Sequence, residues 1–167
     1  MRWLHKLRTN HLFSLYNQVL GQKEDGESKS SNFSKNYHDT VKYLYNHISS
    51  NHDSETLKIM EMIKEGQGMR DLPIKLRTKS VHSGSYGRML RSKPAYTITT
   101  RFDTPPVGRV THPILNRSIT AREAARIQSF SDSFIFYGSK TSIGKQIGNA
   151  VPPLLSKNIA NKLKKIL

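Results

Sequence analysis

Cysteine is absent from the 167 residues of this chain. That absence excludes disulfide bonds, thiolate metal sites and a cysteine nucleophile within the sequence. No stretch is long and apolar enough to predict a membrane span. The first twenty residues also lack the uninterrupted apolar run of a secretory signal. From these absences we expect a protein of the bacterial cytoplasm or nucleoid, with no membrane partner.

Acidic residues are also scarce, since 12 Asp and Glu stand against 27 Lys and Arg and leave a net charge of +15. Between Arg70 and Arg101 there are eight basic residues and a single acid, Asp71. A field of this sign favours an anionic partner. Nucleic acid is the leading candidate and an anionic membrane surface the second, ahead of a merely solvated basic surface.

The usual signatures of catalysis are missing as well. The seven histidines form no convincing metal-ligand pair, so we expect no metal site. There is no phosphate-binding loop and no nucleophile elbow, and the carboxylates are few and scattered. By themselves, composition and these motifs indicate only a basic protein that binds nucleic acid.

The first half of the chain has a weak pattern of structure. Residues 1–40 read as an amphipathic helix followed by a polar linker rich in Gly and Ser. Residues 54–65 predict a helix with Ser54 as its N-cap, and Gly66 can close it in the left-handed conformation. Residues 95–100 (AYTITT) alternate in a way that predicts a strand between two basic loops.

The second half contains two clearer helices. Thr120 and Glu123 have the spacing of a capping box, and Ala124 and Ala125 would allow close approach of a neighbour. The last helix should begin near Pro152 and Pro153, because proline is tolerated in a first helical turn. Its apolar stripe predicts an ordinary docking helix and consists of Leu155, Ile159, Leu163 and Ile166.

Two segments near the carboxyl terminus resemble a known family. Residues 117–132 read RSITAREAARIQSFSD, and residues 146–155 read QIGNAVPPLL. In this order and spacing they resemble the ninth and tenth sequence blocks of DNA cytosine-5 methyltransferases. The departures are mild, with Ile119 and Ile127 in place of leucines and Ser131 in place of a proline. Residues 83–113 are similar to the end of the target recognition region in one branch of that family.

The resemblance implies an α/β fold. It would comprise a small DNA-recognition domain of short strands and loops, plus C-terminal helices that complete a Rossmann-like methyltransferase domain dependent on S-adenosylmethionine (SAM). On this basis we expect an N-terminal helix and polar linker at 1–40 and a target recognition region at 41–116. Residues 117–167 would be the C-terminal helices that return to the catalytic domain.

The resemblance also assigns site residues. Arginine can pair with guanine edges or phosphate, and threonine can donate to phosphate. The alternative for the threonines, a strand with no DNA contact, stays open. The residues expected to contact DNA are Arg88, Arg91, Thr97, Thr99, Thr100 and Arg101. Those expected to be structural, chiefly through ion pairs, are Thr120, Arg122, Glu123 and Arg126.

The tenth block lies beside the S-adenosylmethionine pocket in the family, and by resemblance Asn149, Ala150 and Val151 line that cofactor. The alternative is a simple turn between helices with a capping asparagine. The match of the whole block favours the cofactor.

No catalytic residue is assigned. The family adds a cysteine from a Pro-Cys motif to the cytosine ring, and this chain has none. Three explanations follow: one subunit of a split restriction-modification methyltransferase that needs a complementary chain, an inactive truncated remnant, or a stand-alone module that binds double-stranded DNA. The start at Met1 and the intact tenth block favour the first.

Overall fold

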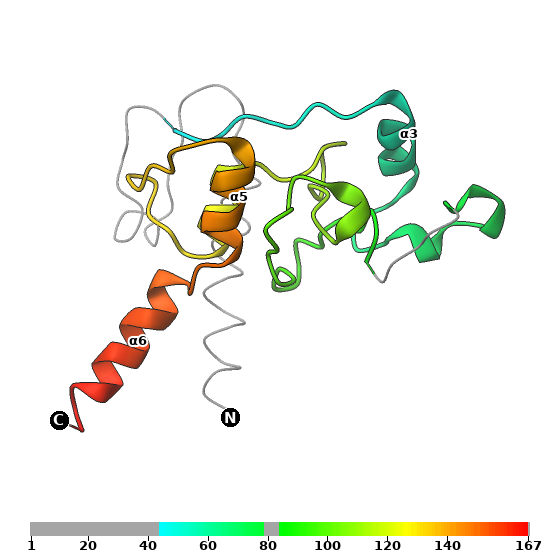
Figure 1. The fold of residues 1–167 in the computed structure, drawn as a ribbon. Helices are drawn as coiled ribbons and strands as arrows, with labels where there is room; N and C mark the ends of the chain where they lie inside the picture. The colour runs from blue at the N-terminus through cyan, green and yellow to red at the C-terminus, as the bar shows by residue number, and fades with distance from the viewer. Residues whose placement is uncertain (1–43, 79–83, 167) are drawn as a thin grey trace.

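The computed structural model describes residues 44–78 and 84–166, so the helix and linker expected over residues 1–40 lie outside it. The described part contains four α-helices (Figure 1). Short 3-10 turns and irregular loops join them. In chain order the α-helices are α3 (Ser54–Met62), α4 (Ala121–Ile127), α5 (Lys140–Gly148) and α6 (Pro153–Leu163). None of these helices is long and apolar enough to cross a membrane.

Helix α3 exists as expected, but its ends differ from the prediction. Its N-cap is Asp53 rather than Ser54, because the Asp53 carboxylate accepts a hydrogen bond from the Thr56 backbone N–H at 2.8 Å. The helix ends at Met62, and the buried Ile63 after it is extended. Gly66 follows with φ of +80°, the left-handed conformation expected of it.

Helix α4 begins as the sequence predicts. Thr120 is its N-cap, with a complete capping box: the Thr120 hydroxyl accepts from the Glu123 N–H and the Glu123 carboxylate accepts from the Thr120 N–H. Ala124 and Ala125 are fully buried, and α4 packs against α5. Two small side chains on one face therefore let another helix approach closely.

The strand predicted for residues 95–100 is wrong. These residues are irregular, and in the described part of the chain the only β-pairing consists of isolated bridges, from Thr111 to Arg88 and to Ser118. The α/β expectation of short strands is thus reduced to these bridges. The physical reason is that the backbone of Thr99 and Thr100 packs against a helix, α5, instead of another strand.

Helix α5 was not predicted. Gly144 and Gly148 weaken the helical signal, since glycine in a helix costs up to about 1 kcal/mol relative to alanine. Ser139 caps the helix by accepting from the Ser142 N–H at 3.2 Å, and the fully buried Ile147 anchors it. Tertiary packing thus overrides the local preference.

Two apolar clusters form the interior. The larger one joins the loops of residues 89–110 to α4 and α5, and the smaller one lies under α3. The larger cluster contains Met89, Ile98, Phe102, Val110, Ile119, Ala124, Ala125, Ile127, Phe136 and Ile147. The smaller contains Ile59, Ile63, Met69, Leu72 and Tyr86. Figure 1 shows α6 extending away from this body, and its apolar stripe belongs to neither cluster.

Candidate functional site

The segment of residues 97–101 alternates between buried and exposed side chains. Ile98 is 6% exposed and packs in the larger cluster, whereas Thr97, Thr99 and Arg101 are exposed. The Arg101 guanidinium makes no hydrogen bond or ion pair with any other described residue. The segment therefore presents a cation and hydroxyl groups at the surface, while the buried Ile98 side chain holds its backbone against the larger cluster.

Arg88 must be removed from the candidate DNA contacts. Its side chain is 4% exposed and points into the protein. It donates five hydrogen bonds, to the carbonyl oxygens of Met60, Ile63, His112 and Leu115 and to the Asn116 side chain, at 2.5 to 2.9 Å. A guanidinium so engaged has no donor left for a base edge. Arg88 instead joins α3 to the loop after residue 111.

Arg91 lies at the surface but is paired. Its guanidinium contacts the Glu65 carboxylate at 3.0 Å, and the Arg91 side chain remains half exposed. Hydrogen bonds from Arg91, against a small opposing effect of burial, lower the pKa of Glu65. Arg91 therefore keeps its exposure, but its charge is partly neutralised.

The structure adds a cationic residue that the sequence did not indicate. Arg109 lies 4.9 Å over the ring of Tyr96, which is 59% exposed. The Arg109 guanidinium also donates to the carbonyl oxygen of Gly66 at 2.9 Å. Its stem crosses Gly87, where a Cβ atom would collide with it. A guanidinium over an aromatic face makes a favourable cation–π contact, and no spacing in the sequence links these two residues.

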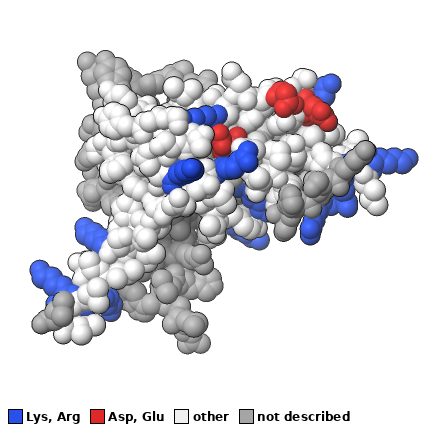
Figure 2. Space-filling view, in the orientation of Figure 1, with Lys and Arg blue, Asp and Glu red and all other residues white. Residues whose placement is uncertain are grey.

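The surface charge is uneven. Lys and Arg side chains gather along α6 and on the opposite side of the molecule, whereas Asp and Glu occupy smaller patches (Figure 2). Asp103 contacts the exposed Lys140 at 3.3 Å, so one acid beside the 97–101 segment is paired. A polyanion would thus meet little repulsion there.

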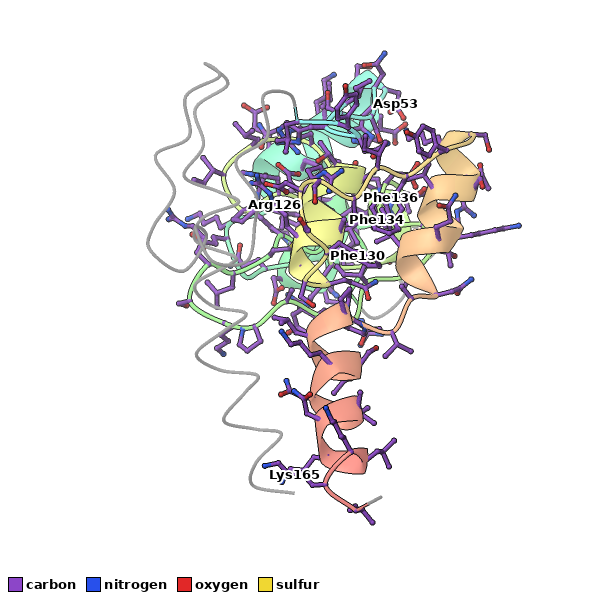
Figure 3. All side chains as sticks on the ribbon, turned by 90° about the vertical axis from the view of Figure 1, so that its left-hand side faces the viewer. Asp53, Arg126, Phe130, Phe134, Phe136 and Lys165 are labelled. Atoms are coloured by element: carbon purple, nitrogen blue, oxygen red, sulfur yellow. The ribbon has the colours of Figure 1, made fainter. Side chains whose placement is uncertain are left out.

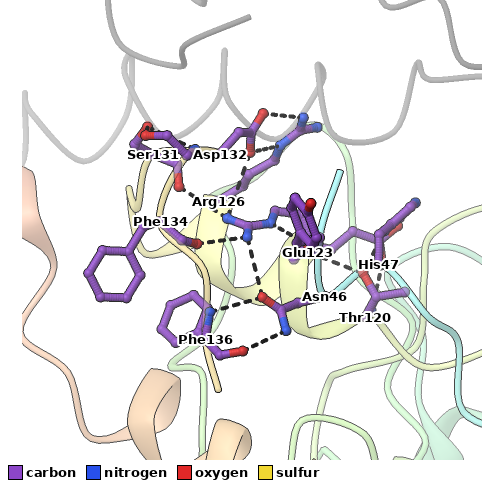
Figure 4. Close-up of polar contacts among 12 residues, drawn as sticks. Asn46, His47, Thr120, Glu123, Arg126, Ser131, Asp132, Phe134 and Phe136 are labelled. Carbon is purple, nitrogen blue, oxygen red and sulfur yellow. Dashed lines mark hydrogen bonds and ion pairs between the residues drawn. The ribbon is translucent and has the colours of Figure 1, made fainter. Parts of the chain in front are cut away.

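The ninth-block residues form a buried polar network around α4 (Figure 4). Glu123 accepts two hydrogen bonds from Arg117, both at 2.8 Å, and Arg126 pairs with Asp132 at 2.5 Å. Burial raises the pKa of Glu123, but the hydrogen bonds and charge of Arg117, together with the hydrogen bond from the Thr120 N–H, outweigh burial and leave that pKa below its usual value. Both carboxylates of this network are thus paired with arginines.

Arg122 is the centre of that network and is 0% exposed. It donates to the carbonyl oxygens of Tyr45, Ser131 and Phe134 at 2.8 to 3.0 Å. The Asn46 side chain bonds both the N–H and the carbonyl of Phe136, each at 3.0 Å. Arg122 and Asn46 therefore tie the segment before α3 to the loop after α4.

Three phenylalanines cluster beside α4 (Figure 3), and one of them, Phe134, is 51% exposed. Phe130 lies 5.3 Å from Phe134 and 5.1 Å from Phe136, and the last two are 4.9 Å apart between ring centroids. These tilted and edge-on contacts are the favoured arrangements of aromatic rings.

The tenth block forms the turn between α5 and α6. Asn149 is the C-cap of α5, and Val151 is 61% exposed. The end of α4 holds this turn at both sides: the Gln128 side chain donates to the Ile147 carbonyl, and the Ser129 hydroxyl accepts from the Leu154 N–H at 3.2 Å. The sequence did not single out Gln128 or Ser129 for this purpose.

The turn is suited to one edge of a ligand site. The Asn149 side chain is exposed and bonds to no other described residue, and Val151 beside it presents an apolar surface. An amide next to a valine can meet both the polar and apolar parts of a nucleoside-like group. Over residues 44–78 and 84–166, no set of three His, Asp or Glu side chains could hold a metal ion.

Comparisons of the sequence with known proteins point to a single family. The family model for C-5 cytosine-specific DNA methylase matches residues 5–165. A type II methyltransferase, M1.HphI, of Haemophilus parahaemolyticus is 37% identical over 74% of this chain and 32% of its own length. M.DdeI of Desulfomicrobium norvegicum is 33% identical over 72% of the chain and 32% of its own length. DNA (cytosine-5)-methyltransferase 4 of Arabidopsis thaliana is 34% identical over 87% of the chain and 11% of its own length. The chain thus spans about a third of the first two relatives.

Proposed function

The chain belongs to the C-5 cytosine-specific DNA methylase family, and from this premise we propose that it is the DNA-recognition and cofactor-flanking part of a DNA (cytosine-5)-methyltransferase. The complete enzyme would transfer a methyl group from S-adenosylmethionine to carbon 5 of a cytosine in duplex DNA. Relatives named type II methyltransferases favour a place in restriction-modification. Residues 41–116 would recognise DNA, and residues 117–167 would return to the catalytic domain.

One observation carries this proposal: α5 packs its Gly144 and Gly148 side against the backbone of residues 99–100 and then runs directly into the turn at 149–151. Arg101, Thr97, Thr99 and Thr100 supply a cation and hydroxyls for phosphate or base edges. Arg91 and Arg109 extend the cationic surface, with the exposed Tyr96 ring beside Arg109. Asn149, Ala150 and Val151 form the edge that would face S-adenosylmethionine.

The chemistry requires a group that this chain lacks. Addition to carbon 6 of cytosine needs a thiolate, and no cysteine occurs in the sequence. We therefore propose that a polypeptide carrying the Pro-Cys motif completes the enzyme. A target base would be flipped out of the duplex between the two parts. When bound, S-adenosylmethionine supplies the electrophilic methyl group, and residues 149–151 orient one side of it.

DNA binding tests the recognition part directly. Fluorescence anisotropy with a labelled duplex should give an affinity that falls as salt rises, through counterion release. Arg101→Ala should weaken binding by about 1–3 kcal/mol if the side chain reads a base, or lower the salt slope by about 1 if it contacts phosphate. Lys157→Ala, at an exposed cation on α6 and outside residues 41–116, is the control. An Arg101 variant indistinguishable from the wild type in both affinity and slope would contradict the assignment.

Methyl transfer tests the rest. The chain mixed with a Cys-bearing methyltransferase polypeptide should transfer labelled methyl groups to duplex DNA, and neither part should do so alone. In that complex Asn149→Ala should raise the dissociation constant of the cofactor, whereas Asn161→Ala, at an exposed position on α6, should not. Tight, sequence-selective DNA binding without activity in any such mixture would favour a stand-alone module. Absence of both would favour an inactive remnant.

A further inference from the structure

Two glycines of α5 face the recognition segment. Gly144 and Gly148 are four residues apart and so lie on the same side of the helix. A Cβ atom added to Gly144 would lie 2.5 Å from the carbonyl oxygen of Thr100. One added to Gly148 would lie 2.5 to 2.6 Å from backbone atoms of Thr99 and Thr100. These atoms belong to the backbone and cannot rotate away as a side chain would.

This contact joins the two halves of the candidate site. Arg101 directly follows Thr100, and Asn149 directly follows Gly148. The DNA-side cation and the cofactor-side amide are therefore each one residue away from the same backbone contact. Gly108 offers a contrast, because a Cβ atom there would meet only a Val110 methyl group at 3.9 Å.

The turn has little freedom to absorb a shift. On its far side, the Gln128 side chain bonds to the Ile147 carbonyl, and the Ser129 hydroxyl bonds to the Leu154 N–H. Ile147 is fully buried, and Ile98 beneath the recognition segment lies in the same apolar cluster. A packed interior of this kind transmits displacement because it has few voids.

We propose that Gly144 and Gly148 are positioning residues that couple DNA contact at residues 97–101 to the conformation of the cofactor edge at 149–151. The inference rests on the proposed function and adds a link between its two sites. DNA held at residues 97–101 restrains their backbone further, and the glycine contact passes that restraint to residues 146–151. By linkage, a cofactor held at 149–151 strengthens the grip on DNA by the same factor.

Hydrogen exchange of the full chain, with and without a duplex oligonucleotide, tests this coupling. In the wild type, DNA should slow amide exchange in peptides covering residues 97–101 and also in those covering 146–151, the latter by roughly fivefold or more. In Gly148→Ala the slowing should persist at 97–101 and disappear at 146–151. Gly144→Ala, which meets fewer backbone atoms, should show a smaller loss, and Gly108→Ala should behave as the wild type.

The possible outcomes distinguish failure of the coupling from failure of DNA recognition at residues 97–101. Slowing at residues 97–101 alone in the wild type, or full coupling retained in Gly148→Ala, would overturn the coupling and leave DNA recognition standing. No slowing at 97–101 would overturn the DNA contact itself and the coupling with it. Exchange of the α4 amides without DNA reports whether a variant is folded. If Gly148→Ala is not, Gly144→Ala and the wild-type comparison decide the question.

Discussion

The ninth-block region, residues 117–132, and the C-terminal turn and helix, residues 149–166, differ in which side chains they bury. Residues 117–132 bury several charged groups, and the structure pairs them inside the protein: Glu123 with Arg117 and Arg126 with Asp132. Residues 149–166 expose apolar groups, with Ile159 at 50% and Ile166 at 80% exposure. The charged region is the interior one, and the apolar stripe faces outward.

The two regions differ in whether their side chains have packing partners within the described part of the chain. A buried charge is tolerated only with partners, and residues 117–132 have them among the described residues. An apolar helical stripe ordinarily faces a core, and α6 has none among those residues. The first region is thus complete by itself. The second fits the proposal that another methyltransferase part covers it.

The largest effect should come from the buried network. Arg122→Met should lower the free energy of unfolding by about 3–5 kcal/mol, because several carbonyl oxygens and Asn46 lose their donor in a buried site. Urea denaturation followed by circular dichroism measures the change. Arg101→Met, at an exposed position, should stay within about 0.5 kcal/mol of the wild type. Equal changes in the free energy of unfolding for the two variants would contradict the distinction between a buried, fully bonded Arg122 and an exposed Arg101.

A smaller effect should follow acidification. His112 is 3% exposed, and its Nδ1 atom accepts hydrogen bonds from the N–H groups of Ile114 and Leu115 at 3.1 and 2.9 Å. Burial lowers the pKa of His112 to about 4, against the opposing Glu123 carboxylate. The unfolded chain, with a pKa near 6.5, binds the proton first as pH falls. Stability is therefore full above pH 6.5, falls by on the order of 3 kcal/mol as pH drops to about 4, and then levels off for this group.

Unfolding measured across that pH range checks the prediction for His112. His112→Asn keeps a short acceptor for the two N–H groups but removes the titrating ring. The variant should lose most of the slope. The remainder comes from His47 and His52, whose pKa values burial also lowers, and toward pH 4 from Glu65 and Glu123, whose pKa values are lowered in the folded chain. A variant with the full wild-type slope would place the titration elsewhere.

The smallest effect on stability should be found on α6. Ile159→Ser should change the free energy of unfolding of the isolated chain by no more than about 0.5 kcal/mol, since the side chain is already half exposed. The same variant should weaken association with the complementary polypeptide, measured by titration calorimetry, whereas Asn161→Ser should not. A large loss of stability in the isolated chain would mean that the stripe is already covered.

The sequence anticipated the helices whose signals are local. Helices α4 and α6 begin as expected. Their start signals, the capping box of Thr120 and Glu123 and the proline at the start of α6, each lie within one helical turn. It missed α5, because Gly144 and Gly148 look like helix breakers until Thr100 is placed against them. It also predicted a strand at residues 95–100, where alternation reflects a buried Ile98 rather than a sheet.

The family can be identified from the sequence, because the ninth and tenth blocks are recognisable by the order and spacing of their residues. The sequence also excludes a thiol nucleophile within the chain, since it contains no cysteine. Which arginines lie at the surface can be seen only in the folded structure. Arg88 and Arg101 belong to equally basic stretches. The Arg88 guanidinium donates five hydrogen bonds inside the protein, whereas the Arg101 guanidinium donates none to the described residues. Burial depends on neighbours distant in the chain, and no local pattern encodes those neighbours.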